Sequence, residues 1–406
     1  MEQFQTKTNM HFQQQLERAG AVDVHREKLM VCVYIQGLET TVVEYGTYTC
    51  DLEKVRDDFL KQGIREVIME STGIYWIALC TLLTNAGIHV TVVNPRFVKN
   101  MPKEKTDKKD ARWLCKLLVN GLVRNSFITS EEQRAFRDLC RMRTRYSNHI
   151  SQARNRILKN LERRNIKLRS VVSNMHTVTA MSIVKALAEG ETDIEKMIAL
   201  SKGRIKEKAE LMRKALVGVI TDHDRMMLRG QLSDIDHYQK QIDIIEDQIH
   251  KHTDKINQQL IENLRQIKGV GERSAQIILA EIGDNVKPFA TADKLAAWTG
   301  VAPGNKESAG KNYYVGRRDG NKHLRTALVQ VAWAAVRTKD TYWRGLYYHL
   351  KKRMSKNKAV VVVARKLLKI IYKVIKGTKS YVEYGIDYFM QRLQQRYAER
   401  NPLVVA

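Results

Sequence analysis

The sequence predicts an α/β domain followed by two mainly helical domains, and three observations support this division. The first part alternates β-rich runs with short amphipathic segments, the pattern of a mixed sheet flanked by helices. No proline occurs between Pro102 and Pro288, so long uninterrupted helices are permitted. Beyond that point, glycine-rich loops separate apolar helices. We therefore expect a flexible arm, a sheet domain, a helical coiled-coil domain and a C-terminal domain, at residues 1–20, 21–128, 129–262 and 263–406.

The order of elements in the sheet domain is that of an RNase H-like fold. Two β-rich runs separated by a short polar segment predict a hairpin, and a third run follows. A helix, a strand, a second helix, a fifth strand and a third helix come next. The expected strands are 21–24, 29–35, 41–50, 66–70 and 89–93, and the expected helices are 51–61, 74–86 and the one that carries Asp107.

Four acidic residues fall where the strands and the last helix of such a sheet converge. Asp23 and Glu70 end two strands, and Asp107 and Asp110 share a helix face, because positions i and i+3 point the same way. Each alone is also an ordinary turn or helix-start residue. Carboxylates held close together repel each other, and a divalent cation relieves that repulsion. The four therefore predict a site for two Mg²⁺ (or Mn²⁺) ions roughly 4 Å apart, suited to phosphoryl transfer.

Composition points to a nucleic-acid partner. The net charge is +26, and the excess of Lys and Arg is spread along the chain. An anionic membrane surface is the rival, but the apolar run 359–364 is far too short to span a bilayer. The N-terminal 20 residues are polar, without a signal-peptide pattern. Five cysteines without a Cys-x-x-Cys pair argue against zinc and disulfides, so we expect a reducing cytoplasm.

The helical middle carries a heptad repeat and a basic face. Apolar residues recur every seven positions at Leu228, Ile235, Ile242, Ile249 and Ile256, which predicts a coiled coil, within the chain or, as we favour, between chains. The segment 137–164 is dense in arginine, where a solvated helix would mix charges more evenly. We interpret this face as a contact for a nucleic-acid backbone, with Arg141, Arg154 and Arg163 as representative contacts.

Two glycine-rich stretches mark the C-terminal domain. Gly269 and Gly271 precede an apolar helix, where a Gly-x-Gly turn lets backbone N–H groups approach a phosphate, as in a helix-hairpin-helix element. Further on, Ser308 stands among glycines and lysines, either as a surface-turn residue or as an exposed nucleophile that needs activation. Basic residues around it are candidate phosphate contacts: Lys306, Lys311, Arg317, Arg318, Lys322 and Arg325.

Several strings resemble those of the DEDD transposases of bacterial insertion sequences, the bridge-RNA-guided recombinases whose first domain is RuvC-like. They are Asp23-Val24-His25, Met69-Glu70-Ser71-Thr72-Gly73, Val93-Asn94-Pro95, Lys105-Thr106-Asp107 with Asp110-Ala111, and Pro303-Gly304-Asn305 with Ser308-Ala309-Gly310-Lys311. The chain departs from that family at Lys103-Glu104, where a Gly-Arg pair is common. The Gly-x-Gly turn and the stretch 316–325 also fit the family, and the resemblance runs from about Asp23 to Phe389.

The resemblance implies a mechanism and a set of partners. Asp23, Glu70, Asp107 and Asp110 would bind the metal, and Ser308 would become covalently linked to DNA. Lys105, within the first acidic string, would contact nucleic acid. The partners would be donor and target DNA, a structured guide (bridge) RNA and further copies of the chain, as a dimer or tetramer joined through the coiled coil. The enzyme would be cytoplasmic in bacteria and associated with the nucleoid when bound to DNA.

Two other functions stay open at this stage. A RuvC-like junction endonuclease would hydrolyse DNA with the four acids alone, and Ser308 would be dispensable. A non-catalytic nucleic-acid-binding scaffold would tolerate changes at all four acids with no loss beyond affinity. Because non-specific binding comes mainly from phosphate charge and weakens with salt, binding alone does not separate these functions.

Overall fold

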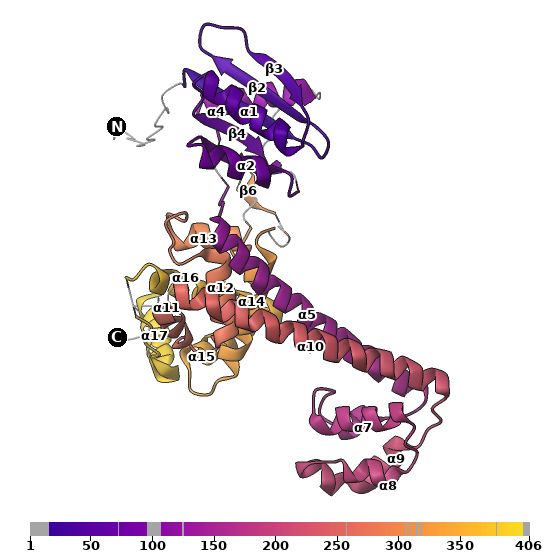
Figure 1. Cartoon of the computed structure of the whole chain (residues 1–406). Helices are drawn as coiled ribbons and strands as arrows, with labels where there is room; N and C mark the ends of the chain where they lie inside the picture. Colours follow the sequence, from indigo (N-terminus) through magenta and orange to yellow (C-terminus); the bar gives the residue numbers. More distant parts are fainter. Residues whose placement is uncertain are drawn as a thin grey trace. The chain divides into compact units, whose positions relative to one another are not determined.

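The computed structural model of the chain divides into two compact units, residues 1–128 (unit 1) and 129–406 (unit 2) (Figure 1). It describes residues 16–71, 73–95, 107–123, 126–256, 258–304, 307–308, 310–313, 316, 319–378 and 380–400. All five cysteines are free, and only Cys50 among them is exposed. No helix in the described part of the chain is both long and apolar enough to cross a membrane.

Unit 1 is built on a mixed sheet with strand order β3-β2-β1-β4-β5. The strands are β1 (Arg18–Val24), β2 (Leu29–Ile35), β3 (Thr41–Tyr45), β4 (Glu66–Glu70) and β5 (His89–Val93). β1, β2 and β3 form an antiparallel meander, whereas β4 runs parallel to β1 and β5 runs parallel to β4. This order and orientation are consistent with the expected RNase H-like fold.

Helices cover both faces of the sheet. On one face, α1 (Thr49–Lys61) and α2 (Trp76–Asn85) contribute Val55, Phe59 and Leu79 to a core with alternate residues of the strands. On the other face, α4 (Asp107–Val119) contributes Ala111 and Leu114 to a second core. Strand residues alternate between these cores because successive side chains in a strand point to opposite faces.

Three boundaries differ from the sequence expectation. β1 begins at Arg18, so the last residues of the expected arm already belong to the sheet, while residues 1–15 lie outside the described part. β3 ends at Tyr45 rather than at residue 50. The chain bends at Thr47 and Tyr48 and enters α1 at Thr49, because a helix that buries Val55 and Phe59 is more stable here than a longer strand.

The longest elements of unit 2 are two antiparallel helices, α5 (Glu131–Arg163) and α10 (Asp222–Ile256), which pack against each other (Figure 1). The ring of Tyr146 on α5 lies 5.4 Å from that of Tyr238 on α10. Leu228, Ile235, Ile242 and Ile249 are all buried within the single chain. The expectation that this heptad seam joins two chains is therefore wrong for these positions, because α5 and the helices between the pair already cover it.

Small helices fill the far end of the pair. They are α6 (Leu168–Val171), α7 (Val178–Glu189), α8 (Ile194–Ala199), the 3-10 helix η1 (Gly203–Lys208) and α9 (Ala209–Leu216). Their apolar residues share one core with α5 and α10, in which Ile157, Ile183 and Met212 are fully buried. Figure 1 shows α7, α8 and α9 gathered beside that end of the helix pair.

The rest of unit 2 is a helical bundle at the other end of the pair (Figure 1). Its elements are α11 (Gln258–Arg265), α12 (Glu272–Ile282), α13 (Ala292–Thr299), the short strands β6 (Glu307–Ser308) and β7 (Lys311–Asn312), α14 (Lys322–Arg337), α15 (Tyr342–Lys351), α16 (Lys356–Ile375) and α17 (Gly385–Arg400). The amphipathic helix α16 is central, with Val363, Leu367 and Ile371 fully buried. On α15, Trp343 and Tyr347 are core residues, while Tyr348 is exposed.

Candidate active site

Asp23 and Glu70 lie side by side at the carboxyl ends of two parallel strands. The register pairs Ala21 with Ile68 and Val22 with Met69, so the next residues of β1 and β4 are Asp23 and Glu70. Ala21 and Ile68 face the core under α4, and the alternation of a strand places Asp23 and Glu70 on that same face. The Asp23 residue is only 7% exposed, which is unusual for an ionisable side chain.

Helix α4 brings the remaining two acids to this face. Ala111 and Leu114 pack into the core beside Ala21, which fixes the side of α4 that meets the sheet. Asp110 directly precedes Ala111 and is half-buried, and Asp107 stands one turn earlier as the first residue of the helix. The side chain of Asp107 lies outside the described part of the structure. Topology thus places three of the acids on one face of the sheet, and their convergence on a single point stays a prediction.

The donor set suits a hard divalent cation, because carboxylate oxygens are the ligands that Mg²⁺ prefers. Among residues whose side chains the structure describes, no group of three or more His, Cys, Asp or Glu side chains is arranged to hold a metal ion. That set excludes Asp107, one of the four expected ligands. The chemistry of the acids and their placement on one face of the sheet therefore suit a divalent cation. The described carboxylates alone do not form a complete set of ligands.

Two neighbouring residues position these acids. The imidazole Nε2 of His25, two residues beyond Asp23, lies 3.1 Å from Asp23 Oδ2. After Glu70, both the backbone N–H of Ser71 and its hydroxyl donate to the carbonyl of Val93, at 3.0 and 3.1 Å. This double contact ties the end of β4 to the end of β5. Sequence reasoning placed His25 and Ser71 in motifs but assigned neither a role.

Ser308 lies in unit 2 on a small β-hairpin. Its strand β6 pairs antiparallel with β7, with Ser308 opposite Lys311. Gly310, in the tight turn between the strands, has φ +73°, a conformation that glycine adopts without steric cost. The Lys311 side chain is exposed, whereas the side chain of Ser308 lies outside the described part. The serine is therefore carried on a turn with a defined backbone, as an exposed nucleophile would require.

The two ends of the loop that carries this hairpin are held together by close backbone contact. The backbone N–H of Asn321 donates to the carbonyl of Trp298 at 3.0 Å. A Cβ added to Gly320 would meet the backbone N of Gly300 at 2.5 Å, so only glycine fits there. Gly300 itself ends α13 in the left-handed conformation, with φ +78°. The hairpin thus rises from a fixed base between α13 and α14.

A buried carboxylate reinforces that base. Glu281, near the end of α12, is 1% exposed. Its two oxygens accept from the Arg141 guanidinium at 2.7 and 2.8 Å, and Arg137 lies 3.3 Å away. The amide of Asn321 donates to the same carboxylate at 2.6 Å, while its oxygen caps the first turn of α14. Glu281 therefore joins α5, α12 and α14 beneath the Ser308 loop.

Sequence reasoning missed Glu281, although a signal was present. The residue is a lone carboxylate inside an apolar helix, and such a residue is seldom buried unless it is paired. Burial lowers the pKa of Arg137, and the Glu281 carboxylate opposes that shift. The pair is consistent with a structural ion pair within the basic face of α5.

The basic face of α5 is largely paired within the chain. Arg143, only 2% exposed, bonds to Glu246 on α10 at 2.7 Å. Arg163 and Arg164 lie 3.2 and 2.7 Å from the buried Asp224. Burial alone would raise the pKa of Asp224, but hydrogen bonds from Thr221 and the two arginines hold it below its usual range. Much of the charge that sequence reasoning assigned to nucleic acid therefore has acidic partners.

The three representative contacts differ in their availability. Arg141 is engaged with Glu281, yet about a third of its side chain stays exposed. Arg154 lies beside His176, and burial lowers the pKa of that arginine. Arg163 pairs with Asp224 while 57% of its side chain is exposed. Their role in nucleic-acid binding stays a prediction.

A cavity of about 650 Å³ opens between α5, α12 and α14. Arg141 and Arg145 line it from α5, and Lys322 and His323 line it from the start of α14. Burial lowers the pKa of His323, and the charge of Arg141 lowers it further. Two predicted nucleic-acid contacts, Arg141 and Lys322, thus meet at one basic cavity, together with Arg145 of the predicted basic face and His323.

The Gly-x-Gly turn before α12 serves packing at one of its glycines. A Cβ on Gly269 would lie 2.5 Å from the carbonyl oxygen of Val331, so this glycine allows close approach to α14. Gly271 is the N-cap of α12, with open space at its Cβ position. Among the remaining predicted nucleic-acid contacts, Lys322 is exposed and Arg325 is half-buried. Four others lie outside the described residues: Lys105, Lys306, Arg317 and Arg318.

The mixed sheet of unit 1 is consistent with an RNase H-like fold, and three acids lie on one of its faces. Two family models match the chain: a DEDD transposase model, described as Transposase, over residues 21–166, and the Transposase IS116/IS110/IS902 family over residues 261–349. The first contains all four acids and the second contains Ser308. No curated protein matches the chain. The chain is a DEDD-type transposase of the IS110 family, an enzyme that cuts and rejoins DNA.

Proposed function

We propose that this transposase recombines DNA through a covalent bond between Ser308 and a DNA phosphate, at a site completed by Asp23, Glu70, Asp107 and Asp110. The observation that carries the proposal is the Ser308 hairpin, a short turn held on a fixed base between α13 and α14. A nucleophile needs such placement, because orientation toward the phosphorus supplies much of the rate of an attack.

The proposed step conserves the energy of the phosphodiester. The Ser308 oxygen forms a bond to phosphorus, the bond from phosphorus to one deoxyribose oxygen breaks, and the proton of the serine hydroxyl ends on the leaving sugar oxygen. One ester replaces another, so no external energy source is required. Attack by the hydroxyl of a second strand reverses the step, frees Ser308 and joins the exchanged strands.

The acids would hold a divalent cation next to the reacting phosphate. Asp23, Glu70, Asp107 and Asp110 are the residues that would bind it. When bound, the cation would neutralise charge that develops on the phosphate oxygens. Around this site, His25 would orient the Asp23 carboxylate, and Ser71 would fix the strand end that presents Glu70.

We also propose that the acids and the serine come from different protomers and that a structured RNA guides target choice. The acids belong to unit 1 and Ser308 to unit 2, which are separate compact bodies. A net charge of +26 favours extensive contact with a polyanion. Guidance by base pairing would place target selection in the RNA, a division of labour also found in Cas9-type enzymes.

Covalent trapping tests the chemistry. The protein, RNA from its own element, Mg²⁺ and cognate DNA are mixed and run under denaturing conditions, beside Ser308→Ala and Asp107→Ala. We expect a protein–DNA adduct in the parent that both variants lack. Ser151→Ala, at an exposed serine on α5, and Asp222→Asn, at an exposed acid, are the matched controls and should form the adduct. Omitting the RNA should abolish the adduct if guidance is correct.

The same gel separates the alternatives. Cleaved DNA without an adduct, unaffected by Ser308→Ala, would replace the serine mechanism with that of a junction endonuclease. That mechanism does not require the hairpin on which Ser308 lies. Absence of cleavage in every lane would remove support for the proposed chemistry in this copy and favour a binding scaffold.

Mixing the two inactive variants tests the composite site. If each site takes its acids from one protomer and its serine from the other, Ser308→Ala and Asp107→Ala complement each other. In randomly mixed dimers, about a quarter of the sites would then be intact. If acids and serine act within one protomer, every site in the mixture carries a defect and no adduct forms.

A further inference from the structure

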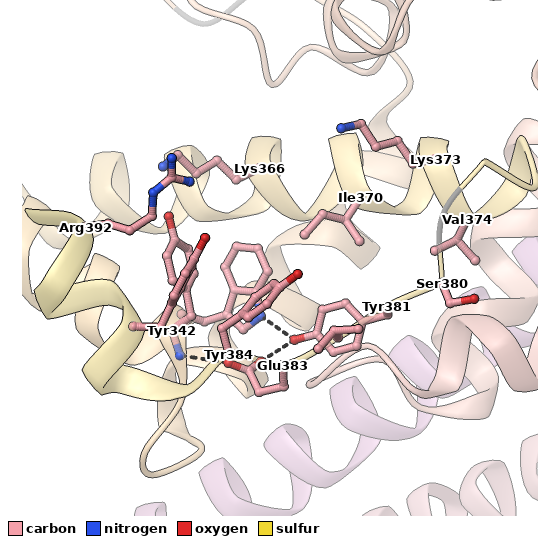
Figure 2. A pocket seen from close by; sticks show the side chains of 13 residues that line it. Tyr342, Lys366, Ile370, Lys373, Val374, Ser380, Tyr381, Glu383, Tyr384 and Arg392 are labelled. Carbon is pink, nitrogen blue, oxygen red and sulfur yellow. Dashed lines mark hydrogen bonds between the residues drawn. The ribbon is translucent and has the colours of Figure 1, made fainter. Parts of the chain in front are cut away.

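A pocket in the C-terminal bundle lies mostly beyond the regions that match the family models, and only Tyr342 and Trp343 of its lining fall within them. It occupies about 260 Å³ between the start of α15, the second half of α16 and the segment that leads into α17 (Figure 2). Its lining includes tyrosines and basic residues: Tyr342, Tyr384, Tyr388, Lys366, Lys373 and Arg392. Its volume falls just below the roughly 300–1,000 Å³ of typical small-molecule sites, which suits one planar group.

The tyrosines provide aromatic faces. The rings of Tyr384 and Tyr388 stack with centroids 4.5 Å apart and 26° between their planes. Tyr342 stands 6.4 Å from Tyr388. Tyr384 is 49% exposed, so this ring is accessible to a planar ligand from solution. Stacking on such rings is the sequence-independent means by which proteins bind unpaired bases.

Cations stand beside these rings. Lys366 Nζ lies 5.9 Å from the centre of the Tyr342 ring, and the Arg392 guanidinium lies 5.8 Å from that of Tyr388. Figure 2 shows Lys366 and Arg392 together at one end of the pocket and Lys373 toward the other end. Burial lowers the pKa of Lys366, and the charges of Arg396, Arg392 and Lys369 lower it further. This crowding of positive charge is relieved by an anion.

The acid in the pocket wall is already used within the fold. Glu383 Oε1 accepts from the backbone N–H of Tyr342 at 2.9 Å and from that of Gly385 at 3.2 Å. Its other oxygen accepts from the Tyr381 hydroxyl, which in turn accepts from the indole N–H of Trp343 at 2.9 Å. Within the described part of the chain, neither Lys366 nor Arg392 forms an ion pair. Their charges therefore remain available to a ligand.

We propose that this pocket binds an unpaired nucleotide of a single-stranded nucleic acid, with the base against the tyrosine rings and the phosphate at Lys366 and Arg392. An aromatic face beside a cluster of cations matches a base and its phosphate. The strand could be RNA or DNA, because both present the same two groups. The test of this proposal measures binding without cleavage, so it does not depend on covalent trapping at Ser308.

Two exposed side chains allow a test that spares the fold. Tyr384→Ala removes a stacking face and Arg392→Ala removes a phosphate contact, and both residues are exposed. Matched controls are Tyr397→Ala, at a 65% exposed tyrosine on α17, and Lys376→Ala, at an exposed lysine beyond α16. The full-length protein is titrated with labelled oligouridine, oligothymidine and a duplex of mixed sequence, with fluorescence anisotropy as the readout.

We expect Tyr384→Ala to weaken binding to a single strand by roughly 5- to 100-fold, the range for loss of one stacking contact. Arg392→Ala should weaken it and reduce the salt dependence by about one phosphate contact. Duplex binding and both controls should stay within about twofold of the parent. Tighter binding of oligouridine than of oligothymidine would identify RNA as the ligand, and the reverse would identify DNA.

Two results would overturn the proposal. In one, the pocket variants bind single strands as the parent does, or the parent binds none. In the other, Tyr384→Ala loses duplex and single-strand affinity equally, which would indicate a general change in the surface. Neither result bears on covalent trapping at Ser308, so failure here leaves the proposed function intact.

Discussion

Two buried carboxylates, Asp23 in unit 1 and Glu281 in unit 2, are used in opposite ways. Glu281 is 1% exposed and accepts a bidentate bond from Arg141, with Arg137 and Asn321 beside it. Asp23 is 7% exposed and contacts the partly exposed His25 at 3.1 Å, at a strand end next to Glu70. Fixed guanidinium donors mark a carboxylate that holds helices together.

The comparison teaches that burial of an acid does not by itself indicate catalysis. Both residues are buried acids, and structural ion pairs bury charged groups just as active sites do. The surroundings separate them: Glu281 sits where three helices cross, whereas Asp23 sits at the carboxyl edge of a sheet with further acids on the same face. A functional assignment therefore depends on neighbours and topology.

The largest expected effect is on activity at Asp23. Asp23→Asn keeps the shape but removes the charge, so strand cleavage should fall by about a thousandfold or more, as for other groups that act as a unit in catalysis. The unfolding free energy should change little, because an amide can still accept from His25. Adduct yield and urea unfolding measure the two quantities. A stable variant with parental cleavage would remove Asp23 from the active site.

The reverse pattern is expected at Glu281. Glu281→Ala leaves Arg137 and Arg141 without their carboxylate in a buried place, which should cost about 3–5 kcal/mol of unfolding free energy. Chemical denaturation measures this loss. Glu262→Ala, which removes an exposed carboxylate paired with Arg265, is the control and should cost less than about 1 kcal/mol. Equal stability of the two variants would show that the Glu281 network contributes nothing.

The base of the Ser308 loop provides a third, smaller test. Gly320→Ala places a methyl group 2.5 Å from the backbone N of Gly300, and neither backbone can move without separating α13 from α14. We expect a loss of about 1–3 kcal/mol in stability together with a lower adduct yield. Gly316→Ala meets nothing within 4 Å and is the matched control. If both variants form adduct equally, the fixed base is not required for Ser308 chemistry.

The smallest expected effect is a pH dependence at His323. Burial and Arg141 hold its pKa below the ordinary value of 6.5, and a positive charge in the first turn of α14 is also unfavourable. As pH falls through the unfolded-state pKa, the unfolded chain binds a proton at His323 that the folded chain does not bind. The stability of the folded state therefore decreases. His323→Gln should reduce the loss measured by urea unfolding between pH 7.5 and 5.5, with His237→Gln as the exposed control.

Unit 1 could be predicted closely because its signals are local. The expected strands 66–70 and 89–93 match β4 and β5, and the hairpin of β1 and β2 is present. Alternating apolar residues and turn residues encode such elements within a few positions. The positions of Asp23 and Glu70 at strand ends followed from the same pattern. The error at β3 arose because the expected strand was extended through Thr49 and Cys50, whereas these exposed residues form the first turn of α1, whose packing rests on Val55 and Phe59.

Unit 2 was predicted in outline, but the ion pairs within it were not predicted. Long helices were expected from the absence of proline and from the heptad repeat, and α5 and α10 are such helices. The basic face of α5 was read as a nucleic-acid surface because the arginines are crowded along one helix. Their acidic partners stand on other helices, so a pattern confined to α5 could not reveal them.

The sequence by itself determined the alternation of strands and helices in unit 1, the acids at the ends of the strands and the two long helices of unit 2. These follow from side-chain periodicity and turn chemistry, which act between near neighbours. Only the tertiary structure decided that the heptad seam is buried inside one chain and that Arg143 meets Glu246 across 103 residues. Such pairings depend on which helices pack together, because a charge is neutralised by whatever group the fold brings beside it.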